Sequence, residues 1–300
     1  MKKILISSIV ASLVVTGCVA NEATLKNTNV KHVNAVAINN AKSVAKQKNS
    51  EIKLVQEAVD SLKYAHDALN ALEKNDTKAA SKYLEKALGK LEVTLSSKKV
   101  PELLPVDSIV TVNEFIGTSD TVKDMVKLAK KLLDEDKVQA AKEVLAPLKS
   151  EIGISVINLP LATYPDALKE TAKLVHNDKV DEAKVVLGTA LNTLVEVDTI
   201  IPIPVLEATD LIAAAANIAE KDTEEAKIFL EAAQEELKIS RYLGYVSKSD
   251  VTYKALDDAI NALKSDIRSK EVKTLFTNLK DKLKDFSSKI FSSKNDSKNK

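Results

Sequence analysis

The chain has 300 residues and a formal net charge of +1, because 44 Lys and Arg stand against 43 Asp and Glu. With 45% hydrophobic residues, the composition is typical of a folded protein with a core and not of a disordered chain. The single Cys excludes an intramolecular disulfide and Cys-based metal centres, and the six glycines are too widely spaced for a phosphate-binding loop or a nucleophile elbow.

The N-terminus has the pattern of a bacterial export signal. Two lysines precede an apolar run over residues 4–15, which is too short to span a bilayer stably. The run ends in Val15-Thr16-Gly17-Cys18, which resembles a lipobox, so residues 1–17 are predicted to be a lipoprotein signal peptide and Cys18 the lipidated residue. Cleavage after Ala20, which would leave a soluble periplasmic protein, is the alternative. The protein is exported in both cases. In the first case it is also anchored by lipid in the bacterial envelope and faces the periplasm.

Residues 18–44 are predicted to be a polar tether that runs into a modest helix, and residues 45–266 form the predicted main domain. From Ile52 onward, apolar residues recur at helical spacing, and short Asp-bearing turns interrupt this pattern. Each turn leads into a second helix that opens near a small Ala, and we expect the Asp to cap that helix. The four turns contain Asp76, Asp136, Asp178 and Asp222. Their irregular spacing argues against a regular solenoid and predicts several helix-turn-helix hairpins packed into one globular helical domain.

Three β-branched, Pro-bearing stretches separate the hairpins. Pro blocks a helix there, and the Val and Ile content favours extended chain. We expect short strands or extended crossovers, and we expect them to be buried. The stretches are Val100–Ile116, Ile152–Pro165 and Val195–Val205. The predicted fold class is therefore mainly α, with short extended or β segments at the Pro-bearing crossovers.

Residues 267–300 are predicted to form a basic amphipathic helix followed by a disordered tail. Apolar residues from Val272 to Ile290 step by 4, 3, 4, 3 and 4 residues, and lysines lie around this stripe. Two interpretations stay open. The helix docks onto the helical body or self-associates, or it lies on an anionic membrane.

The sequence offers no recognisable catalytic or metal-binding motif. The three His are scattered, and the clustered carboxylates lie on helix turns, where such charges are typically solvated. Six Tyr and five Phe without any Trp leave few stacking surfaces for sugars or single-stranded nucleic acid. We therefore predict no enzyme activity, no cofactor, no metal site and no nucleic-acid partner.

The best candidate for a binding site lies where polar residues interrupt the apolar, Pro-bearing segments. In one interpretation, Tyr164 and Asn192 satisfy buried backbone groups at a crossover. In the other, a ligand or peptide groove lies between the duplicated segments. The candidate residues are Asn158, Thr163, Tyr164, Asn192, Thr193 and Asp198.

Several short strings in the central region form a characteristic series. The most specific is Leu159-Pro160-Leu161-Ala162-Thr163-Tyr164-Pro165. The others are Leu104-Pro105-Val106-Asp107, Ala190-Leu191-Asn192-Thr193-Leu194, Ile201-Pro202-Ile203-Pro204 and Leu243-Gly244-Tyr245. In this order they resemble the YfdX family of exported bacterial proteins, over roughly residues 45–265. The resemblance implies a mainly helical exported domain without established catalytic residues, associated with envelope stress, including acid stress, and with chaperone-like behaviour.

Together, the patterns and the resemblance predict a non-enzymatic envelope lipoprotein with a stress-related, protein-binding or chaperone-like role. The alternative is a small-molecule or peptide-binding module that uses the Tyr164 region. The predicted partners are the lipid membrane, through the N-terminal anchor, and other envelope proteins, and a homo-oligomer is compatible with the sequence.

Overall fold

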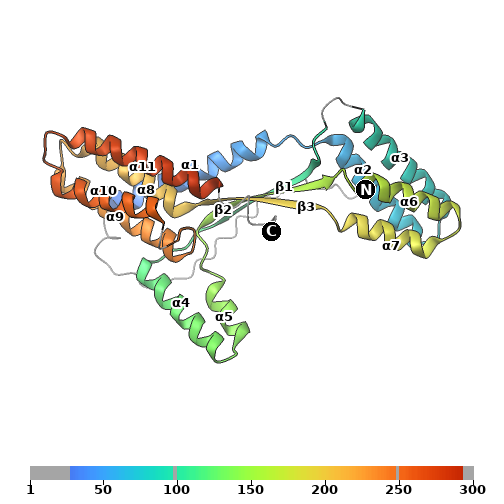
Figure 1. Ribbon diagram of the computed structural model, residues 1–300, viewed down its shortest axis with the longest axis horizontal. Helices are drawn as coiled ribbons and strands as arrows, with labels where there is room; N and C mark the ends of the chain where they lie inside the picture. Colours follow the sequence, from blue (N-terminus) through green and yellow to red (C-terminus); the bar gives the residue numbers. More distant parts are fainter. Residues whose placement is uncertain (1–27, 97–99, 248–249, 293–300) are drawn as a thin grey trace. The chain divides into compact units, whose positions relative to one another are not determined.

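The computed structural model describes residues 28–96, 100–247 and 250–292. The predicted signal peptide, Cys18 and the first part of the tether lie outside these described residues. The described chain forms eleven helices and a three-stranded sheet, which confirms the predicted fold class (Figure 1). Its contacts divide it into two compact units, which corrects the prediction of one globular helical domain.

The first unit, Lys48–Ile109 with Ile154–Asp198, is built from two helical hairpins. Their helices are α2 (Gln56–Glu73), α3 (Thr77–Leu95), α6 (Tyr164–His176) and α7 (Val180–Leu191). Helix α3 packs against α6 and α2 packs against α7, so the two hairpins cover each other's apolar faces. Fully buried side chains such as Leu72, Leu84 and Leu187 fill the space between them, and small residues such as Ala80 and Ala183 let the helices approach closely.

Three of the hairpin turns contain a residue with left-handed backbone, whereas we expected each turn Asp to cap the following helix. Asn75, Asp136 and Asp178 have φ values of 55°, 57° and 55°, in the left-handed region that Asn and Asp tolerate better than most residues. Asp136 and Asp178 therefore end the preceding helix and do not cap the next one, which corrects the prediction for these two turns. Asp76 and Asp222 do cap, because their Oδ1 atoms accept from the backbone N–H groups three residues later, each at 2.9 Å.

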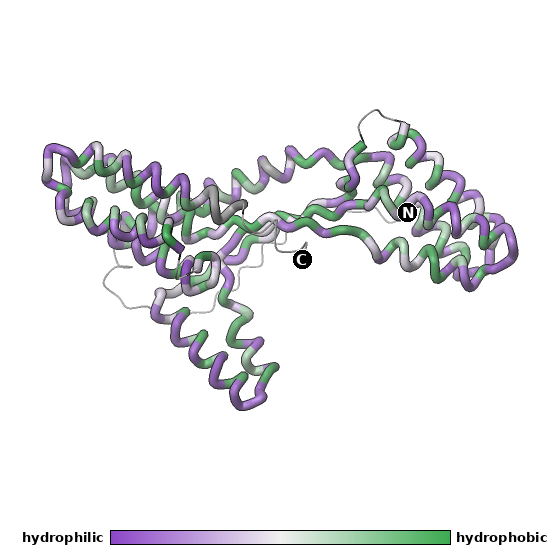
Figure 2. Tube along the Cα trace, in the orientation of Figure 1, coloured by the Kyte–Doolittle hydropathy of each residue, from purple (hydrophilic) through white to green (hydrophobic). Residues whose placement is uncertain are grey.

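The second unit contains four helices that follow the sheet in the chain, α8 (Ile203–Ile218), α9 (Thr223–Tyr242), α10 (Val251–Asp266) and α11 (Val272–Ser292). The N-terminal helix α1 (Thr28–Glu51) contributes Val30 to the same core. The apolar stripe of α11 is buried there through Phe276, Leu279, Leu283 and Phe286. The structure therefore uses this stripe for docking onto the helical body, which leaves the described part of the stripe unavailable to a membrane surface. Hydrophobic and hydrophilic residues alternate along α11 in Figure 2.

A further hairpin of the second unit, α4 (Ser119–Asp134) with α5 (Val138–Leu145), follows the first strand. Helix α4 contacts α9 near its start, where the Ser119 backbone N–H donates to Glu235 Oε1 at 2.8 Å. Of its apolar side chains, Val122 and Ala129 of α4 and Ala141 of α5 are buried. The rest of its apolar surface is only partly covered.

The three Pro-bearing stretches form one sheet with strand order β1-β2-β3. The strands are β1 (Leu103–Asn113), β2 (Glu151–Pro160) and β3 (Val195–Pro202), and the boundary between the two units falls within each of them. Pro160 and Pro202 end their strands, where no further ladder donor is needed. The expectation of burial holds only in part, because Ile109 of β1 is 42% exposed and Val197 of β3 is 38% exposed.

Candidate functional site

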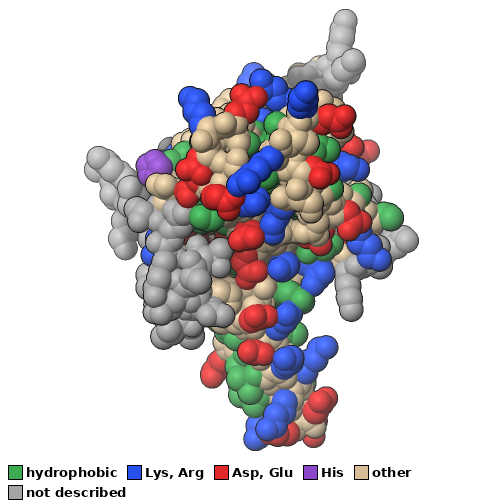
Figure 3. All heavy atoms as spheres, turned by 90° about the vertical axis from the view of Figure 1, so that its left-hand side faces the viewer, with side chains coloured by type: hydrophobic (Ala, Val, Ile, Leu, Met, Phe, Trp, Pro, Cys, Tyr) green, Lys and Arg blue, Asp and Glu red, His purple; other side chains and the backbone are tan. Residues whose placement is uncertain are grey.

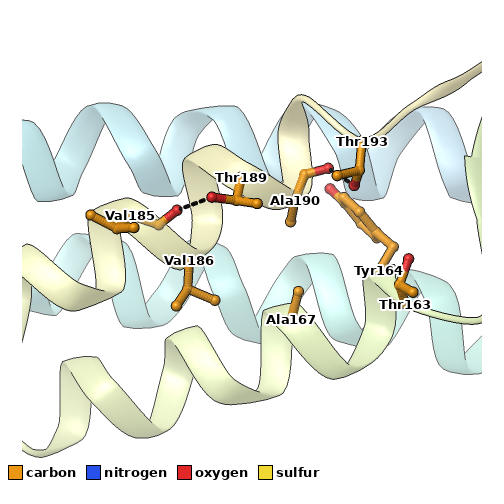
Figure 4. A pocket seen from close by; sticks show the side chains of 8 residues that line it. All are labelled: Thr163, Tyr164, Ala167, Val185, Val186, Thr189, Ala190 and Thr193. Atoms are coloured by element: carbon orange, nitrogen blue, oxygen red, sulfur yellow. Dashed lines mark hydrogen bonds between the residues drawn. The ribbon is translucent and has the colours of Figure 1, made fainter.

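A pocket opens between α6 and α7 in the first unit (Figure 4). Its volume of about 420 Å³ falls within the range of roughly 300–1,000 Å³ that is typical of small-molecule sites. Buried or half-buried side chains form its wall, and the exposed residues Thr163, Val185, Thr189 and Thr193 form its rim. The eight lining residues are Thr163, Tyr164, Ala167, Val185, Val186, Thr189, Ala190 and Thr193.

Helix α6 positions the aromatic residue of the pocket at its first turn. Tyr164 begins the helix and Pro165 follows it, at a position where the fixed φ of Pro suits a helix and its missing N–H is not needed. The Tyr164 side chain is 0% exposed and lies across toward Ala190 and Thr193 of the α7 end (Figure 4). The start of α6 therefore fixes the ring between the two helices.

The Tyr164 hydroxyl finds no hydrogen-bond partner among the residues that the structure describes. Burial raises the pKa of this phenol, so the group stays a protonated donor at physiological pH. A buried hydroxyl without a partner destabilises a protein by about 1–3 kcal/mol. A ligand with an acceptor oxygen would remove this penalty, and the hydroxyl is the feature of the pocket that most directly indicates a ligand.

The remaining polar groups of the pocket are uncharged. Thr189 Oγ1 donates to the Val185 carbonyl and Thr193 Oγ1 donates to the Ala190 carbonyl, each at 2.8 Å (Figure 4). The hydroxyl protons of Thr189 and Thr193 are thus already used, whereas Thr163 adds a further hydroxyl at the rim. None of the eight lining residues carries a formal charge. The pocket can therefore hold an uncharged, largely apolar molecule, and its own side chains offer no acid–base pair for catalysis.

The structure brings three of the six predicted site residues, Thr163, Tyr164 and Thr193, into this pocket. It places the other three outside the lining. Asn158 donates to the carbonyls of Val156 and Val195, at 2.9 and 3.2 Å, and so satisfies backbone groups between strands.

Asn192 and Asp198 have local roles. Asn192 ends α7 as its C-terminal cap residue, and Asp198 accepts from Ser155 Oγ at 2.6 Å. The backbone-satisfying role that the first interpretation gave to Tyr164 thus belongs to Asn158, and the pocket lies between α6 and α7 and not between the duplicated strand segments.

Sequence reasoning missed the α7 wall of the pocket. Val186, Thr189 and Ala190 follow the three- and four-residue steps of one helix face, but such spacing is also that of an ordinary core. Only the packing of α6 shows that this face is incompletely covered.

The second unit contains a pair of carboxyl side chains that bury each other, Glu207 on α8 and Glu236 on α9. Glu207 is 8% exposed and its carboxyl hydrogen-bonds that of Glu236, while Asn34 Nδ2 of α1 donates to Glu236 Oε1 at 3.4 Å. Burial, aided by the neighbouring carboxylate of Glu235, raises the pKa of Glu236 to about 7. Burial and the charge of Glu236 raise the pKa of Glu207 well above its ordinary value, with a further contribution from Glu114. The two carboxyls share a proton near neutral pH and tie α8 to α9.

Comparison with known proteins identifies the region around the pocket. Residues 61–200 match the family model described as YfdX protein. The resemblance seen in the sequence is thereby confirmed for this YfdX segment, which contains all eight residues of the pocket, whereas α8 to α11 lie beyond it.

A solved crystal structure of YfdX from Salmonella Typhi is also similar to this chain. It shares 16% sequence identity, with a TM-score of 0.36, and the alignment covers 51% of this chain and 94% of that chain. No curated protein matches the chain. Among the helices that the structure describes, none contains a stretch that is long and apolar enough to cross a bilayer.

Proposed function

We propose that this protein is a non-enzymatic binding protein whose YfdX segment holds a small uncharged ligand between α6 and α7. The observation that carries the proposal is the buried Tyr164 hydroxyl, which has no partner among the described residues and belongs to a residue that lines a pocket of about 420 Å³. The proposal favours the small-molecule alternative of the sequence analysis, because a peptide would need pairing groups for its backbone amides and the lining offers few.

The chemistry of the lining defines the ligand class. Val185, Val186, Ala167 and Ala190 supply apolar contact, and Tyr164 supplies one hydrogen-bond donor. A ketone, an ester or an ether with a short apolar body matches this set, since it carries one acceptor oxygen and no charge. A charged ligand would lose its hydration without gaining an ionic partner.

A pair of isosteric probes tests this assignment. Acetophenone and α-methylstyrene have the same arrangement of heavy atoms, with C=CH2 in place of C=O, but only the ketone can accept from Tyr164. We expect the ketone to bind about tenfold more tightly by isothermal titration calorimetry, which corresponds to one buried hydrogen bond of about 1.4 kcal/mol. In Tyr164→Phe this difference should disappear, because the donor is lost while the shape of the ring is kept.

Two variants serve as controls for the probe experiment. Tyr253→Phe changes a Tyr that is 4% exposed in the second unit, and it should leave both affinities unchanged. Ala167→Leu fills the pocket and should weaken both probes together. Equal affinity of the two probes for the wild type, or a ketone preference that survives in Tyr164→Phe, would refute the role of the hydroxyl.

We further propose that the protein is exported and anchored to the envelope through Cys18. The support is the N-terminal sequence alone, since residues 1–27 lie outside those the structure describes. Growth with radiolabelled palmitate should label the wild type, and Cys18→Ser should lose the label and move to the soluble periplasmic fraction. Equal labelling of both forms would contradict the anchor.

The stress-related, chaperone-like role in binding other envelope proteins is part of the proposal on the strength of the family resemblance. Its test is the aggregation of an acid-treated client protein, followed by light scattering with increasing amounts of this protein. Suppression that rises with its concentration would support the role, and scattering that is unchanged at a molar excess would contradict it.

A further inference from the structure

Helix α1, which follows the predicted anchor Cys18, carries positive charge that its own sequence does not balance. It contains four Lys and one His, and its only acidic residue is Glu51 at its end. Each of the other ten helices that the structure describes has an Asp or a Glu before its last residue. Helix α1 is therefore the one described helix without a carboxylate along its length.

Three of the four lysines lie on one side of α1. At about 100° per residue, Lys31, Lys42 and Lys46 fall within about 60° of one another around the helix axis. Lys31 and Lys46 are exposed, and Lys42 is half-buried. Val36 is 41% exposed and lies about 80° from Lys46, with the exposed Asn39 between them. The basic face, defined by these three lysines, thus borders an apolar side chain.

The contacts that hold α1 in the second unit leave the basic face free of carboxylates. Three asparagines of α1 hydrogen-bond carboxyl groups of α8 and α9: Asn29 with Glu225 at 3.0 Å, Asn34 with Glu236 at 3.4 Å, and Asn40 with Asp210. Asn29 and Asn40 lie about 100° or more from each lysine of the basic face around the helix axis. The carboxyl of Glu236 is buried, where it shares a proton with Glu207. None of these groups therefore neutralises the basic face.

Lysines on other helices are paired with acidic side chains. Lys123 Nζ lies 2.8 Å from Asp120 Oδ1, and Lys184 Nζ lies 3.2 Å from Asp181 Oδ1, in each case three residues along one helix. On the face of the molecule drawn in Figure 3, basic and acidic side chains are interspersed. By contrast, no lysine of the basic face forms an ion pair with a residue that the structure describes. Their charge is available to an anionic partner outside the chain.

The position of α1 in the chain selects that partner. Thr28 is ten residues after Cys18, and an extended chain of ten residues spans at most about 36 Å. A lipid on Cys18 therefore keeps α1 within about one bilayer thickness of the headgroups. An anionic phospholipid surface is negative and lies at this place. A nucleic acid would also suit a basic helix, but export separates the protein from it.

We propose that α1 docks on anionic phospholipid, with Lys31, Lys42 and Lys46 at the headgroups and Val36 at their boundary with the acyl chains. This inference rests on the proposed anchor at Cys18, and it adds a second contact that orients the second unit on the bilayer. Each lysine near an anionic surface favours the docked state about fivefold, so the three together favour it about a hundredfold. Because stable membrane association takes two signals, the basic face orients a tethered chain and does not by itself recruit a soluble one.

The sequence suits a direct test, because Cys18 is the only Cys and there is no Trp. The chain that begins at Cys18, which is the predicted mature form, is coupled through this thiol to a maleimide lipid, so the test does not depend on lipidation in the cell. Asn39→Trp places a single fluorophore beside the basic face. With vesicles that contain about 30% phosphatidylglycerol, we expect blue-shifted emission and quenching by brominated phosphatidylcholine. Vesicles of phosphatidylcholine alone, or about 0.5 M salt, should abolish both effects.

Charge reversal on the basic face should undock the helix. Lys31→Glu with Lys42→Glu and Lys46→Glu should lower the ratio of docked to undocked chain, measured by quenching, about a hundredfold or more. If this triple variant loses helical circular dichroism, Lys31→Gln with Lys46→Gln changes only exposed side chains and should lower the ratio at least tenfold.

Two controls separate docking of α1 from general effects. The matched triple variant Lys127→Glu, Lys130→Glu and Lys131→Glu makes the same change in net charge on the exposed surface of α4 and should leave docking intact. Val93→Trp reports on α3 of the first unit and should stay in water.

The outcomes distinguish the docking of α1 from the anchor. Emission of Asn39→Trp that is the same on neutral and anionic vesicles, or docking that survives reversal of the basic face, would overturn the proposal while leaving the anchor untouched. Loss of palmitate labelling in cells would refute the anchor, whereas the coupled chain would still show whether α1 binds anionic lipid.

Discussion

Lowering the pH from 8 to 5 should stabilise the second unit, because Glu236 binds its proton more tightly in the folded chain than in the unfolded chain. Burial raises the pKa of Glu236 to about 7 from an ordinary value of 4.5. Glu207, which hydrogen-bonds it, has its pKa raised by burial as well. The other polar groups that bear on the pair are Asn34 of α1, Glu235 of α9 and Glu114, of which Asn34 donates and the two carboxylates repel.

The sign and size of the effect follow from this difference in pKa. A carboxyl with a raised pKa in the folded state destabilises the fold fully above pH 7, and this penalty disappears as the pH falls toward 4.5. A difference of about 2.5 pKa units corresponds to about 3 kcal/mol at 1.36 kcal/mol per unit. Protonation of one carboxyl removes its repulsion of the other. The stabilisation of about 3 kcal/mol is therefore counted once for the pair and not once for each carboxyl.

Urea unfolding at pH 8, 6.5 and 5, combined with hydrogen exchange of the α8 and α9 amides, measures this gain locally. Glu236→Gln replaces the titrating carboxyl with a neutral side chain of nearly the same shape. It should stabilise the unit at pH 8 by up to about 3 kcal/mol and reduce the dependence on pH. Glu231→Gln, on the same helix beside Lys264, is the matched control and should keep the wild-type dependence. A wild type that is less stable at pH 5 than at pH 8, or a Glu236→Gln variant with an unchanged dependence, would refute the reasoning.

Three further substitutions test the hairpins of the first unit by urea unfolding. Asp76→Ala removes the cap that accepts from the Ala79 N–H and should destabilise the unit by about 1 kcal/mol; no loss would show that water replaces the cap. Asp178→Val places a β-branched residue at a φ of 55° and should destabilise by about 1–2 kcal/mol, whereas Asp178→Gly should be tolerated; equal stability of the two would contradict the strain. Leu84→Ala opens a cavity at a site that is 0% exposed and should destabilise by about 2–5 kcal/mol; a loss below about 1 kcal/mol would mean that the hairpins repack around it.

The hairpins could be predicted from the sequence because helical periodicity and turn residues are local signals. The steps of apolar residues fix which face of each helix is buried, and a turn such as 73–77 interrupts the pattern. The capping pattern could not be resolved at the same level. Asp136 and Asp76 look alike in sequence, since each lies in a short acidic turn between two helices. Asp136 has the left-handed backbone that ends a helix, whereas Asp76 lies at the N-cap position of the next helix. This difference of one position in the turn is visible only in the backbone.

The candidate site, too, could be predicted from the sequence only in part. The string around Tyr164 identified an unusual polar residue in apolar chain, and the structure places it in a pocket with Thr163 and Thr193. That its hydroxyl lacks a partner among the described residues, while Asn158 is paired with two backbone carbonyls, depends on side-chain directions that no spacing rule gives. The Glu207 and Glu236 pair was missed because 29 residues separate its members, and each looks like a surface charge by itself.

The sequence by itself determined the local structure of this protein: its mainly helical class, the Pro-ended extended segments, the apolar stripe of the last helix and the resemblance to the YfdX family. These depend on periodicity, backbone propensity and short strings, which are properties of neighbouring residues. The tertiary structure decided which hairpins cover each other, where a buried hydroxyl or carboxyl is left without compensation, and which side of α1 stays exposed. Those features depend on packing between segments that are distant in the sequence. Packing alone decides which polar groups are removed from water and which apolar faces stay in contact with water.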